Sequence, residues 1–349
     1  MRQLFKIAAP AFFVLAIIFY KNFANSKIMN VDNYPIWMID KNGHQTNQTS
    51  GICYLGISKT NGLKQFAVAD DDGHIERIMI DEKQNPPAIT IIPVVLADTV
   101  EKFFKDFIKK DFEEISYNKK SERLYITVEG FAQQWKTRDF KLYEGVYEMT
   151  YDKDYYNFDT ILTVKKLPMP DTVFQYTQAN CAFEGLGVTD NNFFLGLENI
   201  QTPQGSFTDS TLIYVVNRKN FNDIHYLMLK QYKIVTVCGL YAKDDQNLYG
   251  VDRSSRNMFH ITLDTNFNIT DVKLIAMDLP IPGHPDIDGG ITFPIESITM
   301  DENGRFYCTE DPWEDYYKPD PLDKKKLTVE ELEHFKKFTP VLFKFQSSF

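Results

Sequence analysis

Residues 296–310 read Glu-Ser-Ile-Thr-Met-Asp-Glu-Asn-Gly-Arg-Phe-Tyr-Cys-Thr-Glu, and this stretch decides the fold because the chain contains five segments built like it. An apolar stretch leads into the turn sequence Asp-Glu-Asn-Gly, and a second apolar stretch leads out of it and ends in an acid. Runs of β-favouring residues on both sides of an Asn-Gly turn predict an antiparallel hairpin. The segment therefore predicts two short strands, the first opened by Glu296 and the second closed by Glu310.

The other four segments share a polar or small first residue, a second residue that is usually small, and an aliphatic third residue. They begin at Ser50-Gly51-Ile52, Glu113-Glu114-Ile115, Glu184-Gly185-Leu186 and Cys238-Gly239-Leu240. The second strand of each again ends in an acid, and these acids are Asp70, Glu129, Glu198 and Asp252. The acid lies 14 positions after the first motif residue in the last three copies, and longer hairpin turns explain the wider spacing of the first two.

A third strand can be traced after most of the hairpins, for example at residues 145–151 and 211–217. The unit recurs every 54 to 71 residues, counted between the first motif residues. A sheet of this kind cannot bury both of its faces alone, so neighbouring copies must stack and close into a ring. The sequence therefore predicts an all-β, five-bladed β-propeller. A six-bladed ring, with a degenerate sixth blade drawn from residues 147–178, is the alternative.

Two helical insertions are expected within the single propeller domain, which we place at residues 31–349. Residues 328–338 open with Thr-Val-Glu-Glu, the signature of a capping box. Residues 98–112 place three phenylalanines on one helical face, with lysines between them. We expect this second insertion to pack over a neighbouring blade, and contact with a membrane is the other interpretation.

The N-terminal segment, residues 1–30, has the pattern of an export signal. Arg2 and Lys6 precede an uncharged run over residues 7–20, which is short for a straight membrane-spanning helix. The small residues near Ala24 form a poor cleavage site, so both a cleaved signal peptide and a retained membrane anchor stay open. The expected location is outside the cytoplasm: periplasmic, membrane-anchored or secreted.

Charge and cysteine content narrow the classes of partner. The formal net charge is -10, and such a surface repels phosphate backbones, so we expect no nucleic-acid partner. The four cysteines lie in or beside the repeat motifs, which favours apolar packing over a disulfide framework. No paired Cys/His spacing typical of structural zinc is present in the sequence.

Three stretches resemble the SdiA-regulated family of bacterial propeller proteins. They are residues 180–186 (Asn-Cys-Ala-Phe-Glu-Gly-Leu), 295–310 and 49–52, and the resemblance extends in order from about residue 49 to residue 347. It implies a small propeller related to calcium-dependent lactonase and phytase-like propellers. The biochemical activity of the family is poorly defined, so the resemblance bears on the fold more than on the function. The insertions near residues 98–110 and 319–337 depart from the family pattern.

Equivalent residues of the first strand of every blade form a ring at the channel of a propeller. The first-position ring consists of Ser50, Glu113, Glu184, Cys238 and Glu296. Like charges about 4 Å apart repel by about 4 kcal/mol at an effective dielectric of about 20. Water, a proton or a hard cation must relieve this repulsion, and carboxylate oxygens suit Ca²⁺ or Mg²⁺. We therefore predict Glu113, Glu184 and Glu296 as metal ligands and Ca²⁺ as the candidate cofactor, and the resemblance implies a metal at this position.

A second ring is formed by the acids that end the second strands. These acids either line the channel or accept backbone hydrogen bonds and latch the blades together: Asp70, Glu129, Glu198, Asp252 and Glu310. Beside the first of them, Asp70-Asp71-Asp72-Gly73 resembles part of a calcium loop. It lacks the downstream Glu of an EF-hand, which favours a plain turn.

Two functions are compatible with these residues. The first is a ligand-binding or scaffolding propeller of the cell envelope, with a divalent cation in the channel and a small molecule or envelope protein as partner. The second is a calcium-dependent hydrolase of lactones, esters or phosphates. Because no nucleophile motif and no unmistakable general base is present, we favour the non-enzymatic hypothesis.

Overall fold

The computed structural model describes residues 27–130, 139–152, 158–289, 292–313 and 316–346. Residues 1–26 of the predicted export signal lie outside this description. Within it, no helix has the length and apolar character needed to cross a bilayer.

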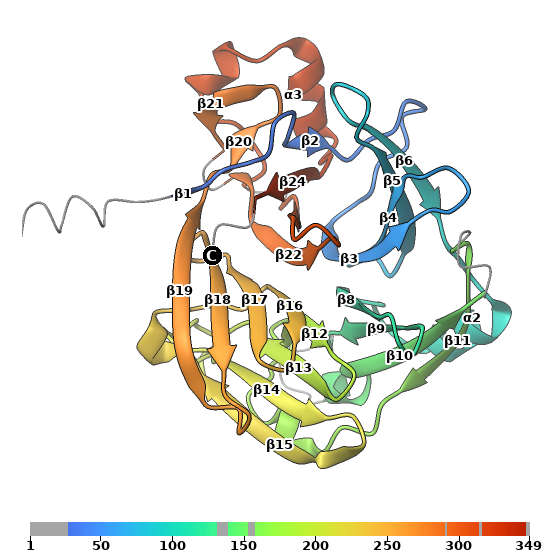
Figure 1. The fold of residues 1–349 in the computed structure, drawn as a ribbon, viewed down its shortest axis with the longest axis vertical. Coiled ribbons are helices and arrows are strands. Elements are labelled where there is room, and N and C mark those ends of the chain that lie inside the picture. Colours follow the sequence, from blue (N-terminus) through green and yellow to red (C-terminus); the bar gives the residue numbers. More distant parts are fainter. Residues whose placement is uncertain (1–26, 131–138, 153–157, 290–291, 314–315, 347–349) are drawn as a thin grey trace, which may run out of the picture.

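Five blades of four antiparallel strands each surround a common centre (Figure 1), which confirms the predicted propeller. From the centre outward, blades 1 and 2 contain β3 (Thr49–Ile57), β4 (Lys64–Asp70), β5 (Ile75–Asp81) and β6 (Ala88–Pro93), then β8 (Phe112–Asn118), β9 (Arg123–Val128), β10 (Gly145–Tyr151) and β11 (Thr160–Lys166). Blades 3 and 4 contain β12 (Phe183–Val188), β13 (Asn192–Leu197), β14 (Leu212–Asn217) and β15 (Asn220–Met228), then β16 (Gly239–Asp244), β17 (Asn247–Asp252), β18 (Asn257–Leu263) and β19 (Ile269–Met277). The six-bladed alternative was wrong, because β10 and β11 are the outer strands of blade 2.

Blade 5 is completed by the N-terminal part of the chain. Its strands are β22 (Ile295–Met300), β23 (Phe306–Glu310), β24 (Val341–Phe345) and β2 (Ile36–Trp37). The preceding strand β1 (Lys27–Ile28) runs parallel to β19 at the outer edge of blade 4. The segment from β1 to β2 therefore connects the last two blades, and its pairing with β24 closes the ring.

The narrow centre explains why the second motif residue is small. Each innermost strand packs against the innermost strands of both neighbouring blades. A Cβ atom on Gly239 would lie 2.8 Å from the Cα atom of Ser297, and one on Gly185 would lie 2.9 Å from the Cβ atom of Leu240. Five strands can therefore close around one axis because their backbones approach each other at these positions.

Aromatic side chains fill the space between blades. Phe66 of blade 1 packs against Tyr307 of blade 5, with ring centroids 4.8 Å apart, and Tyr125 of blade 2 meets Phe193 of blade 3 at 5.1 Å. The cysteines belong to the same apolar packing. All four are buried and free: Cys53, Cys181, Cys238 and Cys308.

Both predicted helical insertions are present. The first helix is shorter than the sequence predicts, and the second agrees with the prediction. Helix α2 (Asp98–Phe104) ends well before residue 112, because the chain must turn at residues 105–111 to enter β8. Helix α3 (Val329–Lys336) has the predicted capping box, with Thr328 as N-cap and Glu331 as its partner. The remaining short elements are β7 (Val95–Leu96), β20 (Pro280–Ile281), β21 (His284–Asp288) and the 3₁₀ turns Asp139–Leu142, Asp171–Phe174, Lys230–Tyr232 and Asp323–Lys325.

Candidate functional site: the acidic mouth of the channel

One mouth of the channel lies where the innermost strands begin, and acidic side chains converge there. Ser50, Glu113, Glu184, Cys238 and Glu296 open the five innermost strands or directly precede them. Their surroundings are largely closed to water, and only 12% of the Glu184 side chain is exposed. We call this region the acidic mouth. It contains eight carboxyl groups, from Asp71, Asp111, Glu113, Glu129, Glu184, Glu198, Glu296 and Asp311.

On one side of the acidic mouth, Arg253 lies among three carboxylates. Its guanidinium contacts Glu198 and Glu296 and lies 3.8 Å from an oxygen of Glu184. The same group stacks over the ring of Trp313, 5.0 Å from its centroid. A planar guanidinium can bind several carboxylates at once and never loses its charge. We call Arg253 with these three glutamates the arginine half.

On the other side, Lys109 faces the aspartates. Its Nζ atom lies 2.5 Å from an oxygen of Asp111 and 3.4 Å from an oxygen of Asp71. One oxygen each of Asp71, Asp111 and Glu113 lie within 4.8 Å of one another. Ser50 donates a hydrogen bond to Asp71. We call Lys109 with these three acids the lysine half.

One buried oxygen of the lysine half has no partner. Asp111 is 1% exposed, and its Oδ2 atom forms no hydrogen bond within the described chain. A buried carboxylate oxygen without a donor is costly. The lysine half is therefore short of positive charge or of hydrogen-bond donors.

Burial and mutual repulsion raise the pKa values of these acids. Burial, followed by the charge of Asp71, raises the pKa of Glu113 well above its usual range. The same two causes raise the pKa of Asp111 to about 6 and that of Asp311 to about 7. Burial and the neighbouring Glu198 raise the pKa of Glu184 to about 8. Eight carboxyl groups share two cationic side chains here, so protons or a further cation must balance the rest near neutral pH.

The predicted metal ligands do not form one group. The structure brings Glu184 and Glu296 to Arg253, whereas Glu113 lies with Asp71 and Asp111. Glu184 and Glu198 also have ligand atoms within 4.8 Å of the Cys238 sulfur. Burial raises the pKa of that thiol well above its usual range, which disfavours the thiolate that a metal needs.

Most of the strand-end acids hold loops in place. Asp70 accepts a hydrogen bond from His74 N at 2.7 Å, and Glu129 accepts one from Ala182 N. Asp252 accepts from Val235 N at 2.9 Å, and Glu310 accepts from Val341 N at 2.9 Å and from the Tyr317 hydroxyl at 3.1 Å. Glu198 instead faces Arg253 in the acidic mouth.

Below the acidic mouth, Glu114 spans the channel axis. One of its oxygens accepts hydrogen bonds from Ile52 N at 3.2 Å, Ile115 N at 3.1 Å and the Ser297 hydroxyl at 2.6 Å, and the other accepts from Leu240 N at 3.4 Å. These partners belong to blades 1, 2, 5 and 4. Glu114 thus ties the innermost strands of four blades together. Beyond it, a cavity of about 700 Å³ opens at the opposite mouth.

Sequence reasoning missed Arg253, Lys109, Asp111 and Asp311 as members of this site, and it noted Asp71 only within a stretch that resembles part of a calcium loop and was interpreted as a plain turn. Arg253, Asp71 and Asp311 each stand directly after a strand-end acid, so one repeat position supplies an arginine in blade 4 and aspartates in blades 1 and 5. This alignment was available in the sequence. Lys109 and Asp111 had no such signal, because they lie in the connection that the sequence predicted as helix.

The fold and this site define a five-bladed β-propeller with an acidic channel mouth. No family model matches the chain and no curated protein matches it, so membership of the SdiA-regulated family stays a prediction. Solved structures similar to it include a luciferin-regenerating enzyme, which is 11% identical with a TM-score of 0.42 over 79% of this chain and 73% of that chain.

Two further similar structures are sugar dehydrogenases. The PQQ-bound aldose sugar dehydrogenase of Streptomyces coelicolor is 7% identical, with a TM-score of 0.42 over 89% of this chain and 96% of that chain. A glucose dehydrogenase is 10% identical, with a TM-score of 0.42 over 90% of this chain and 100% of that chain. Similarity at this level says nothing about the activity of the present chain.

Proposed function

We propose that the protein is an exported propeller of the cell envelope that binds a divalent cation, Ca²⁺ in the first place, at the acidic mouth and recognises a ligand or envelope partner there. The lysine half carries this proposal. It has three oxygen donors within 4.8 Å of one another and a buried Asp111 oxygen without a partner. Carboxylates grouped in this way suit a hard cation.

The two halves differ in how easily their own basic side chain can leave the carboxylates to a bound metal ion. Arg253 contacts Glu184, Glu198 and Glu296, and its side chain is 13% exposed, so a fixed positive charge already occupies the arginine half, although the buried Oε2 atom of Glu184 also has no hydrogen-bond partner within the described chain. The Lys109 side chain is 30% exposed, so its ammonium group can turn to solvent and leave Asp71 and Asp111 to the cation. We therefore expect Asp71, Asp111 and Glu113 as ligands. Glu184 and Glu296 become available only where Arg253 moves away.

Calorimetric titration of the chelator-treated full chain with CaCl₂ tests this proposal. We expect one Ca²⁺ per chain and a loss of affinity of about tenfold or more, 1.4 kcal/mol, in an Asp111→Asn, Glu113→Gln double variant. The matched Glu184→Gln, Glu296→Gln variant should bind nearly as the natural chain does. A larger loss in the second variant would move the site to the first-position glutamates, and an absence of binding in the natural chain would reject the cation.

The proposed location has its own test. The uncharged run over residues 7–20 behind Arg2 and Lys6 supports export. Cell fractionation should find the protein outside the cytoplasm, either free or attached to a membrane. Recovery of most of the chain as a soluble cytoplasmic protein that retains Met1 would reject export.

A metal-dependent hydrolase of lactones, esters or phosphates is the second candidate, and one observation favours it. Asp311 is 2% exposed, lies in the acidic mouth and has an Oδ1 atom without a hydrogen-bond partner, so it can accept a proton there. A bound cation would supply polarisation of a substrate oxygen. Turnover of p-nitrophenyl acetate, γ-butyrolactone or p-nitrophenyl phosphate that needs Ca²⁺ and is lost in Asp311→Asn would support this candidate. No turnover with any of the three would oppose it.

A further inference from the structure

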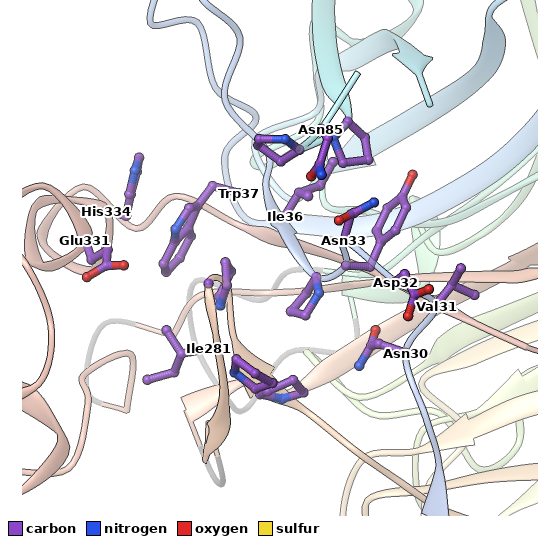
Figure 2. Close-up of a pocket in the computed structure, with 18 of the residues that line it drawn as sticks. Asn30, Val31, Asp32, Asn33, Ile36, Trp37, Asn85, Ile281, Glu331 and His334 are labelled. Carbon is purple, nitrogen blue, oxygen red and sulfur yellow. The ribbon is translucent and has the colours of Figure 1, made fainter. Parts of the chain in front are cut away.

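A cavity of about 1190 Å³ lies away from the channel, beside blade 5. Its walls come from the segment Met29–Trp37, the β20–β21 hairpin, helix α3 and the turn at Asn85–Pro87 between β5 and β6 (Figure 2). None of the eight carboxyl groups of the acidic mouth lines it. The β20–β21 hairpin and helix α3, which lie outside the channel, therefore meet the N-terminal segment at one hollow. We call this hollow the side cavity.

Trp37 supplies a fixed aromatic surface in the side cavity. His334 stacks on the Trp37 ring at 4.7 Å between centroids, and Phe335 meets it edge-on at 5.3 Å. Figure 2 shows the Trp37 side chain between His334 on helix α3 and Ile281 on the hairpin. Trp37 is half-buried and lines the cavity, so part of its surface remains for a ligand. A rigid aromatic ring binds an apolar face with little loss of side-chain entropy.

Four polar side chains of the lining are exposed to solvent and form no hydrogen bond or ion pair within the described chain. They offer two carboxylates and two amides, from Asp32, Glu330, Asn33 and Asn85. The other two acids of the lining are engaged, since Glu331 contacts His284 at 2.8 Å and Asp278 contacts Lys27 at 3.4 Å. Carboxylates accept hydrogen bonds, and amides both donate and accept them. The side cavity therefore offers exposed acceptors and donors to a ligand whose own polar groups can replace the water on them.

The charge of the lining excludes several classes of ligand. Among the described residues that line the side cavity, none is a lysine or an arginine. A phosphate or carboxylate ligand would meet Asp32 and Glu330 without a compensating cation. A wholly apolar ligand would displace water from these acids and offer no hydrogen bonds in place of those that the acids form with water.

We propose that the side cavity binds a neutral carbohydrate. The apolar C–H face of a sugar ring can pack on Trp37, and its hydroxyl groups can donate to Asp32 and Glu330 while they exchange hydrogen bonds with the amides. Six prolines in the lining stiffen the walls and so reduce the entropic cost of binding: Pro35, Pro86, Pro87, Pro280, Pro282 and Pro285. This site is independent of the cation at the acidic mouth.

The test is titration of the purified full chain, in chelator, with glucose, N-acetylglucosamine, cellobiose and chitobiose, followed by calorimetry and tryptophan fluorescence. At least one of these sugars should bind, with a dissociation constant on the order of millimolar or below. An Asp32→Ala, Glu330→Ala variant should weaken that binding about tenfold or more. A Trp37→Phe variant should lose the fluorescence response. The control, Asp286→Ala with Glu333→Ala, removes one acid from the β20–β21 hairpin and one from helix α3, both outside the lining, and should bind as the natural chain does.

Three outcomes would overturn the inference. The first is that none of the four sugars binds. The second is an equal loss in the control variant, and the third is a loss only in the Asp111→Asn, Glu113→Gln variant, which would place the sugar in the channel. Tetramethylammonium chloride serves as the competing probe, since binding of this cation without any sugar binding would show a cation site and contradict the proposal.

Discussion

The two halves of the acidic mouth contain the same number of charges and differ in how those charges are held. Each has three carboxylates and one basic side chain. Arg253 follows the end of strand β17 and is held by three glutamates and Trp313, whereas Lys109 lies in an irregular connection and contacts two aspartates. A guanidinium in such a setting is a permanent structural cation, and an ammonium group on a flexible stem is replaceable. Blade-equivalent positions can therefore hold a structural ion pair on one side of a ring and a candidate cation site on the other.

The largest expected effect is the loss of the arginine half. Arg253→Met leaves three buried glutamates without their cation, and breaking a buried ion pair in this way costs about 3–5 kcal/mol. Urea unfolding measures the loss. Arg256→Met is the control, because Arg256 forms a more exposed pair with Asp288 at 2.7 Å, and its loss should cost about 1 kcal/mol or less. Equal losses in the two variants would show that Arg253 has no special role.

The next effect is the pH dependence of the cation-free protein. Burial raises the pKa of Asp111 to about 6 and, together with Glu198, that of Glu184 to about 8. Groups with raised pKa values bind protons more tightly in the folded chain, so they favour folding at low pH and lose that contribution as pH rises. In chelator, the free energy of unfolding should therefore fall between about pH 4 and about pH 8, by up to about 1.4 kcal/mol for every pH unit by which a pKa is raised. In saturating Ca²⁺ the share of Asp111 should vanish while that of Glu184 remains. A pH profile that does not change with Ca²⁺ would contradict the assignment to the lysine half.

The smallest expected effect concerns Lys109, whose ammonium group Ca²⁺ would replace. In Lys109→Met, Ca²⁺ no longer competes with an ammonium group for Asp71 and Asp111, so calorimetry should show affinity raised by about tenfold, 1.4 kcal/mol. The neighbouring Lys110 pairs with Glu101 at 3.3 Å outside the mouth, so Lys110→Met should leave the affinity unchanged. A weaker affinity in Lys109→Met would mean that the lysine orders the site instead of competing for it.

The repeat explains what the sequence could and could not predict. The pattern of a small second residue before an aliphatic one indicated the innermost strands, because the narrow centre excludes a Cβ at Gly185 and Gly239. The one exception, Glu114, was visible in the sequence, but its role was not. Three of its four hydrogen bonds come from residues that lie far away along the chain and meet only at the axis.

The composition of the acidic mouth was harder to predict for a related reason. Blade symmetry predicted a ring of carboxylates, yet the basic side chains that divide the carboxylates of the acidic mouth come from positions outside the motif. Arg253 follows a strand end, and Lys109 lies after a helix that stops at Phe104 instead of continuing to residue 112. Local periodicity predicted the longer helix because Phe107 and Ile108 extend the apolar face. The helix ends earlier because strand β8 begins at Phe112, and the chain must leave the helix before it can enter that strand.

Thermal unfolding of the full chain in Ca²⁺ and in chelator tests the central claim most directly, with the natural chain compared with Asp111→Asn and Glu184→Gln. At a hundredfold excess over the dissociation constant, Ca²⁺ should stabilise the natural chain by about 2.7 kcal/mol. It should raise the melting temperatures of the natural chain and of Glu184→Gln alike, and raise that of Asp111→Asn only about half as much or less, because a site weakened about tenfold is stabilised by about 1.4 kcal/mol at the same Ca²⁺ concentration. A melting temperature that does not respond to Ca²⁺ in any of the three, or that responds equally in all of them, would contradict the claim that the lysine half is a cation site.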